Sequence, residues 1–202
     1  MIAFQYNKTS LQHLEKQLKM RVRTLPIIKN KESALRIEVK KCKAEMQQHD
    51  EEYAMQLEQY RALFALWNEF DPALVKTGEL IIGRQKLAGV QVPVLEKASF
   101  VVAPYSLVNS PKWFADGIEL LKDMAMTAIR RELLNRKLRL LETARKKTTQ
   151  KVNLFEKVQI PGYQDAIRKI NRFMEDEENL SKSSQKILKS LLEQREEAEN
   201  DN

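Results

Sequence analysis

Residues 11–46 read LQHLEKQLKMRVRTLPIIKNKESALRIEVKKCKAEM, and the spacing of the apolar side chains in this stretch decides the fold. Counted in sevens from Leu11 to Trp67, eight of the nine positions are apolar or aromatic, and the exception is Glu32. An apolar stripe with a period of 3.5 residues stays turned toward one partner helix and winds both helices into a left-handed supercoil. The pattern predicts a long coiled-coil helix over residues 1–70.

The seam of this helix consists of two interleaved sets of residues, each with a spacing of seven. Its apolar members are Leu11, Leu14, Leu18, Leu25, Ile28, Leu35, Val39, Met46, Tyr53, Tyr60 and Trp67. Four polar residues interrupt it, namely Arg21, Glu32, His49 and Gln56. We expect these polar residues to fix the register of the helix pair at some cost in stability. The alternative is that the seam opens at these positions to admit a third protein.

A second helical stretch follows over residues 118–192, and its apolar side chains recur in steps of three and four. They are Leu134, Leu138, Leu141, Val152, Phe155, Val158, Ile170, Phe173 and Leu180. The two stretches are similar in length, and a compact segment between them would turn the chain back. We therefore expect antiparallel pairing, with Leu11 beside Leu180 and Trp67 beside Leu121.

Each predicted helix contains one proline near one end, Pro26 in the first and Pro161 in the second. In the expected pairing these prolines lie at nearly the same level. Proline lacks an amide hydrogen and clashes with the carbonyl four residues earlier, so both helices are predicted to bend together there. The alternative is that a helix begins at Pro26 or at Pro161, because proline is tolerated in a first turn.

The segment between the helices holds most of the residues that interrupt regular structure. Four of the five glycines and four of the six prolines lie between residues 72 and 117. Three valines alternate toward one face over residues 90–94, and glycines bracket the connection, a pattern typical of a β-hairpin. An isolated hairpin is marginally stable in water, so this one is expected to lean on the helices or on a partner. Residues 78–96 are expected to add little to the stability of the coil.

The predicted fold class is therefore all-α, a long antiparallel two-helix coiled coil whose small central insert contains a short β-hairpin. The insert is placed over residues 71–117, between helices over 1–70 and 118–192. From residue 175 onward acids outnumber bases by nine to four. Residues 193–202 are accordingly predicted to form an acidic, disordered tail.

Composition excludes several classes of function. Cys42 is the only cysteine, and with His13 and His49 it supplies too few ligands for a zinc site. Residues 83–89 have the glycines of a phosphate loop but lack its Gly-Lys-Ser/Thr ending. We expect no catalysis and no cofactor, because no carboxylate pair or activated nucleophile stands out. A cytoplasmic protein is expected, since no apolar run can span a bilayer and the N-terminus does not resemble a signal peptide.

Charge is distributed unevenly along the chain, whose formal net charge is +7. Between Arg130 and Lys157 there are ten Lys or Arg residues against three Glu. Such a run can contact phosphates, so a structural or nucleic-acid-binding coiled-coil arm is the alternative function. No helix-turn-helix, RNP-like or zinc-finger pattern accompanies the basic run. A solvated helix face, or a surface that meets an acidic protein, explains it equally well.

Residues 87–96 read LAGVQVPVLE. This stretch resembles the central AGVK-apolar-P signature of the D subunit of the V-type rotary ATPases, and two further stretches resemble the same family. Residues 146–161, KKTTQKVNLFEKVQIP, are similar to its later R-R-V-N-A-L-E…I-P signature. The first helix, with its leucines and the Lys29–Lys31 tract, is similar to the family's L-K-x-K-R opening. The order and spacing of the three stretches agree over nearly the whole chain.

The resemblance implies a central rotor component of a V/A-type ATPase, which transmits torque between the catalytic A3B3 hexamer and the ion-translocating rotor in the membrane. The implied partners are the catalytic A and B subunits, the small F subunit of the rotor and the membrane-side coupling subunit. The chain would then be peripheral on the inner face of the membrane, and ATP turnover in the hexamer would be coupled to proton or sodium transport.

The resemblance also directs attention to two sets of partner-binding residues. The set expected to face the collar of the hexamer comprises Arg145, Lys146, Lys147, Lys151, Asn153 and Glu156. The set expected to bind a partner through the central insert comprises Leu87, Ala88, Gly89, Val90, Val92 and Pro93.

Overall fold

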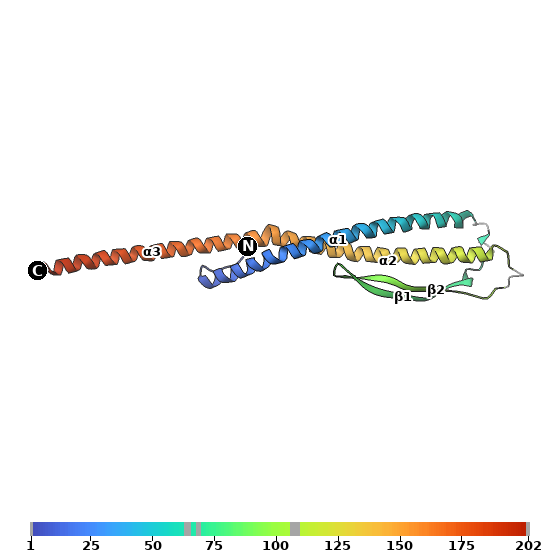
Figure 1. Cartoon of the computed structure of the whole chain (residues 1–202), viewed down its shortest axis with the longest axis horizontal. Helices are drawn as coiled ribbons and strands as arrows, with labels where there is room; N and C mark the ends of the chain where they lie inside the picture. The colour runs from blue at the N-terminus through green and yellow to red at the C-terminus, as the bar shows by residue number, and fades with distance from the viewer. Residues whose placement is uncertain (1, 63–65, 68–69, 106–109, 201–202) are drawn as a thin grey trace. The chain divides into compact units, whose positions relative to one another are not determined.

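The computed structural model describes residues 2–62, 66–67, 70–105 and 110–200. In chain order the elements are α1 (Lys8–Ala62), the 3₁₀ turn η2 (Pro72–Leu74), β1 (Val75–Leu87), β2 (Val90–Val102), α2 (Phe114–Asn153), the π-helical segment η3 (Leu154–Gln159) and α3 (Ile160–Asn200) (Figure 1). The predicted fold class, long helices at both ends and a central antiparallel hairpin, is confirmed. The chain divides into two compact units, residues 30–149 and residues 1–29 with 150–202.

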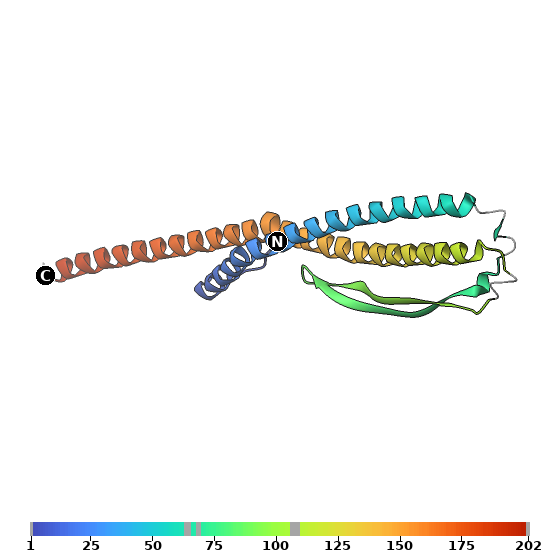
Figure 2. The same ribbon diagram turned by 45° about the vertical axis from the view of Figure 1, so that its right-hand side comes forward.

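In the unit formed by residues 30–149, α2 lies between α1 and the body of the hairpin (Figure 2). All three contribute to one core of buried side chains, which consists of Leu35, Val39, Cys42, Val92 and Leu141. Removing such side chains from water is the main favourable term in folding. Because β2 supplies a member of this core, the expectation that the hairpin leans on the helices is confirmed.

The connection between the two strands is a tight turn formed by Ala88 and Gly89. Their φ angles are 46° and 79°. Positive φ at both positions defines a type I′ turn, whose twist matches that of the strands it joins. A Cβ atom at Gly89 would also lie 3.3 Å from Nζ of Lys31 on α1. The tip of the hairpin therefore lies against α1.

An aromatic cluster surrounds the ends of α1 and α2 in the same unit. Its buried members are Phe70, Phe114 and Ile118, and partly buried residues around them include Trp67, Tyr105, Trp113 and Leu121. The heptad pattern predicts a helix to residue 70 with Trp67 on the seam, whereas the structure ends α1 at Ala62. Trp67 lies beyond that end and stacks on Tyr60, with the ring centroids 4.7 Å apart. Trp67 therefore packs against other aromatic rings and does not occupy the seam position that the heptad spacing predicts.

In the other unit, the first part of α1 pairs with α3 around a core of Leu14, Ala166 and Ile170. The chain before α1 joins this core through Ile2 and Phe4. Asn7 caps α1, because its Oδ1 accepts a hydrogen bond from the backbone N–H of Ser10 at 2.7 Å. The segment before the helix is therefore part of the packing.

The register of this pair differs from the one predicted. Leu11 and Met174 both pack against the core of Leu14, Ala166 and Ile170, and Leu180, the expected neighbour of Leu11, is 70% exposed. Along α1 the seam is nearly equivalent every seven residues, so the apolar spacing allows several registers. In the observed register Ile2 and Phe4 also pack against this core, and Arg21 bonds to Gln159.

The two prolines occupy different positions in their helices. Pro26 lies inside α1, and Pro161 is the second residue of α3, directly after the π-helical segment η3. The alternative that a helix begins at Pro26 is therefore wrong. The second apolar stripe also differs from the predicted one, since Val158 is 60% exposed and Phe173 is 44% exposed.

At the C-terminal end, α3 continues to Asn200, where the sequence predicts a disordered tail from residue 193. Residues 201–202 of that predicted tail lie outside the described residues. Among the described helices, none combines the length and the apolarity that a bilayer crossing requires.

Candidate partner-binding surfaces

The residues predicted to face the hexamer differ in their availability. Lys146, Lys147, Lys151 and Asn153 are exposed. Glu156 instead pairs with Lys29 of α1, with Oε1 2.7 Å from Nζ.

Arg145, the remaining member of that set, is half-buried and lies near Glu32. The pKa of the Glu32 carboxyl is lowered, chiefly by a hydrogen bond from Arg36 and to a smaller extent by the charge of Arg145. Arg145 and the exposed Glu156 therefore interact with α1. Lys146, Lys147, Lys151 and Asn153 are the exposed members of the set for which the structure gives no such pairing with α1.

The residues predicted to bind through the insert lie largely against the helices. Val92 is 1% exposed, and Leu87, Ala88 and Val90 pack against the same core. The exposed apolar side chains of the hairpin lie elsewhere on its strands. Leu80, Ile81, Ile82 and Val94 are 37–43% exposed, and Val101 near the end of β2 is 58% exposed. These side chains, and not the predicted set, are the apolar surface of the hairpin that a partner can reach.

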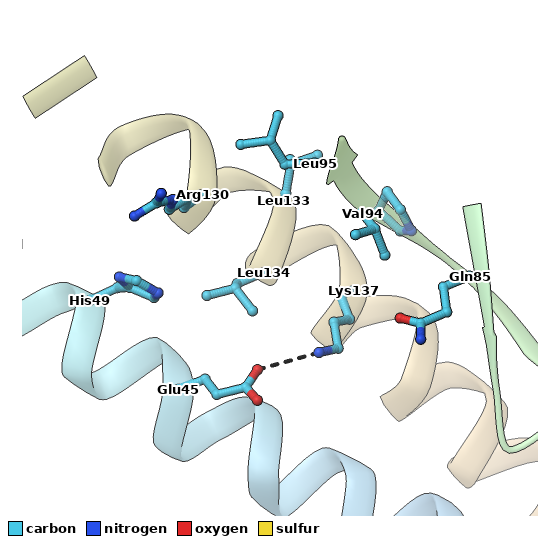
Figure 3. Close-up of a pocket in the computed structure, with 10 residues that line it drawn as sticks. Glu45, His49, Gln85, Val94, Leu95, Arg130, Leu133, Leu134 and Lys137 are labelled. Atoms are coloured by element: carbon cyan, nitrogen blue, oxygen red, sulfur yellow. Dashed lines mark hydrogen bonds and ion pairs between the residues drawn. The ribbon is translucent and has the colours of Figure 1, made fainter. Parts of the chain in front are cut away.

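A hollow of about 290 Å³ is bounded by α1, α2 and the middle of the hairpin (Figure 3). Its apolar lining includes Leu133 and Leu134 of α2 and Leu95 of β2. Glu45 and Lys137 form an ion pair within it, with Oε2 3.3 Å from Nζ. The paired carboxylate is not a free acid or base, and the volume lies at the lower limit for small-molecule sites.

The seam residues of α1 differ in how deeply they are buried in the two units. Leu14, Leu35 and Val39 are buried. Half-buried positions belong to Leu11, Leu18, Leu25, Ile28, Met46, Tyr53 and Tyr60. The polar residues that interrupt the seam are also half-buried, and Glu32 accepts a hydrogen bond from Oγ1 of Thr149 on α2 at 3.1 Å. These polar residues therefore face the partner helix.

A further surface lies on α3 beyond the end of its contacts with α1. We call it the distal α3 stripe, and it consists of Leu180, Ile187, Leu188, Leu191 and Leu192, all between 51% and 70% exposed. Steps of three, four and seven place these side chains on one side of the helix. The steps of three and four among residues 187–192 can be read from the sequence. The sequence-based prediction nevertheless missed this exposed surface, because it assigned Leu180 to the seam between the helices.

The part of the chain that the structure describes contains no candidate metal site. No three His, Cys, Asp or Glu side chains in it lie close enough together to hold a metal ion. The surfaces that remain are suited to protein contacts: a basic run on α2, an apolar patch on the hairpin and an apolar stripe on α3.

Comparison with known proteins agrees with these features. Residues 10–190 match the family of the ATP synthase D subunit. The V-type ATP synthase D subunit of Borreliella burgdorferi is 28% identical over 187 residues, covering 92% of this chain and 93% of the relative. The protein of the same name from Chlamydia pneumoniae is 28% identical over 191 residues, covering 90% of both chains. The chain belongs to the ATP synthase D-subunit family and is a component of a V/A-type ATPase.

Proposed function

We propose that this chain is the central rotor shaft of its ATPase and transmits torque between the catalytic A3B3 hexamer and the ion-translocating rotor. Family membership and the antiparallel pairing of α1 with α2 and α3 support the role. In this proposal the chain is non-catalytic, and ATP turnover belongs to the hexamer. Rotation couples that turnover to the transport of protons or sodium ions.

The distal α3 stripe is the observation that carries the proposal. Leaving large apolar side chains in water forfeits about 1.5–3 kcal/mol for each one. Five such residues on one side of α3, four of them within residues 187–192, therefore favour a protein partner. We assign this stripe to the interior of the hexamer, where apolar contacts hold a shaft without the directional bonds that would lock it at one angle.

The remaining surfaces are assigned to the other partners. Lys146, Lys147, Lys151 and Asn153 would face the collar of the hexamer, where cations steer assembly with acidic surfaces. The small F subunit and the membrane-side coupling subunit would use the unit formed by residues 30–149. The exposed apolar side chains of the hairpin support that assignment. In this proposal the chain is peripheral on the inner face of the membrane through its partners.

A rotation assay on the assembled ATPase tests the shaft role. The variant Lys86→Cys offers an exposed thiol on β1 for attachment of a bead, and the native Cys42 is buried and so competes little. With the hexamer fixed to a surface, ATP should drive the bead in one direction, and a non-hydrolysable analogue should not. A complex that hydrolyses ATP while the bead stays still would contradict the proposal.

A paired substitution tests the role of the stripe. Leu188→Glu with Leu191→Glu should prevent the hexamer from co-purifying while the other partners remain bound. The matched control is Ser183→Glu with Ser190→Glu, which adds the same charge to α3 about 100° or more around the helix from the centre of the stripe. Equal loss of the hexamer in both variants would show that charge, and not the apolar surface, is responsible.

A further inference from the structure

The core-facing side chains around η3 keep the seven-residue repeat. Half-buried positions at Val152, Phe155, Gln159 and Gly162 and the buried Ala166 follow one another in steps of three and four. The stripe that faces α1 therefore continues through η3 into α3.

The π-helical segment interrupts the α-helical hydrogen bonding along this stripe. Its hydrogen bonds span five residues, as in the bond from the N–H of Ile160 to the carbonyl of Phe155. Single π turns inside α-helices are rare and frequently lie at functional sites. Within η3, Val158 is 60% exposed, whereas Gln159 is half-buried and bonds to Arg21 of α1.

Arg21 of α1 lies opposite the widened turn and contacts residues of α3 and η3. Its Nε donates a hydrogen bond to Oε1 of Gln159 at 2.7 Å. Its guanidinium lies over the ring of Tyr163, 4.6 Å from the centroid, and 5.9 Å from that of Phe155. Arg21 thus contacts three residues that follow one another in steps of four along η3 and α3.

A second set of bonds holds the guanidinium itself in place. Its Nη1 donates to the carbonyl oxygen of Gln17 at 3.1 Å and to the side-chain Oε1 of Gln17 at 2.6 Å. The planar guanidinium of an arginine forms these hydrogen bonds only when its partners are in one arrangement. The flexible ammonium of a lysine can instead adapt to several arrangements. The contacts to Gln159 and Tyr163 are therefore specific to one axial position of α3.

We propose that Arg21 and the η3 turn together lock the axial register of α1 against α3, and that Arg21 is a positioning residue for torque transmission. Apolar packing alone would leave registers displaced by seven residues similar in energy, because each presents an apolar stripe to the partner. Directional bonds at an irregular turn occur at one register only. The inference rests on the shaft function, because a sliding helix pair would absorb motion that a locked pair passes on.

The test replaces Arg21 with a side chain that keeps the seam packed. Arg21→Met supplies an apolar residue of similar length, Arg21→Lys keeps the charge without the planar fork, and Gln159→Leu removes the acceptor on η3. The matched control is Arg23→Met, since Arg23 is exposed. Spin labels at Lys19→Cys and Gln164→Cys, both exposed positions in the same unit, report the distance between α1 and α3.

We expect one narrow distance for the native pair and for Arg23→Met. Arg21→Met and Gln159→Leu should add a second population, in which α3 is displaced along the axis by about 10 Å, the length of seven helical residues. With two registers similarly populated, the ions moved per ATP should fall about twofold. Arg21→Lys should recover part of the native distribution.

The melting temperature separates this role from a merely stabilising one. Arg21→Met should keep the melting temperature of the folded chain, because an apolar residue suits the seam. A lower melting temperature with a single native distance would overturn the register lock. Unchanged distances and unchanged coupling would also overturn it. If the native complex shows no rotation, the shaft function fails, and the distance measurement still decides whether the lock exists.

Discussion

Thr149 of α2 donates a hydrogen bond across the helix pair to Glu32 of α1, with Oγ1 3.1 Å from Oε1. The same carboxylate oxygen accepts a bond from Nη2 of Arg36 at 2.9 Å. Glu32 occupies a seam position that the repeat reserves for an apolar side chain. These bonds compensate the half-buried carboxylate, since an unpaired charge in that position would be costly.

The first prediction concerns the pH dependence of this carboxylate. The Arg36 hydrogen bond and, to a lesser extent, the Thr149 bond hold the pKa of Glu32 below its usual value. A lowered pKa contributes stability that is present above the pKa of the unfolded chain and is lost as pH falls through the folded value. Glu32→Gln should therefore reduce the unfolding free energy by about 1 kcal/mol at pH 7, and the difference should vanish at strongly acidic pH.

Urea denaturation of both chains at several pH values measures that difference. Glu38→Gln is the matched control, a half-buried glutamate on the same helix. A pH-independent difference between Glu32→Gln and the native chain would show that shape, and not charge, is responsible.

The second prediction concerns the hairpin as part of the core. Val92 is 1% exposed and packs against the buried side chains of both helices. Val92→Ala should lower the unfolding free energy by about 1–3 kcal/mol, because it removes buried methyl groups and leaves a cavity. Val94→Ala is the control, since Val94 is 37% exposed, and should cost much less. If urea denaturation gave equal losses of unfolding free energy for Val92→Ala and Val94→Ala, the result would support the expectation that the insert adds little to the stability of the coil.

The third prediction concerns the single thiol. Burial raises the pKa of Cys42, and its Sγ lies 3.7 Å from the carbonyl oxygen of Leu134. A raised folded pKa contributes stability that is present below the unfolded pKa and is lost as pH rises through the folded value. The unfolding free energy should therefore fall between pH 8 and pH 10, roughly the range in which an unperturbed thiol ionises.

The variant Cys42→Ala isolates the contribution of the thiol, because it cannot ionise at this position. The slope of stability against pH should be steeper in the native chain than in the variant. Parallel slopes would contradict the prediction. Modification of Cys42 by a thiol reagent should in addition require unfolding, so its rate should follow urea-induced opening of the chain.

The fourth prediction concerns the exposed lysines on α2. Reversing the charge of Lys146, Lys147 and Lys151 should slow assembly with the catalytic hexamer and leave the helix content of the free chain unchanged. Raising the salt concentration should slow native assembly in the same way, because exposed charges are screened. A variant with reversed charge at Lys16, Lys40 and Lys41, all exposed on α1, is the control. Normal assembly of the α2 variant in low salt would show that these lysines are only solvated.

The sequence by itself determined the helices, the central hairpin and the family. Helix formation and apolar periodicity are local properties, so the repeat from Leu11 onward predicts α1 without knowledge of its partner. The turn at Ala88–Gly89 is likewise encoded locally, because glycine tolerates positive φ. The two family signatures are short strings of neighbouring residues and need no tertiary information.

Tertiary structure alone decided the register and the roles of individual side chains. The spacing of apolar residues leaves Leu180 as acceptable a neighbour for Leu11 as Ile170. In the structure Leu11 packs against the core that contains Ile170, and Arg21 bonds to Gln159. The π turn of η3 lies where Arg21 of α1 meets Phe155 and Gln159, and no spacing in the sequence predicts it. Directional bonds and ring contacts act between residues far apart in the chain, so their outcome is fixed only when the helices meet.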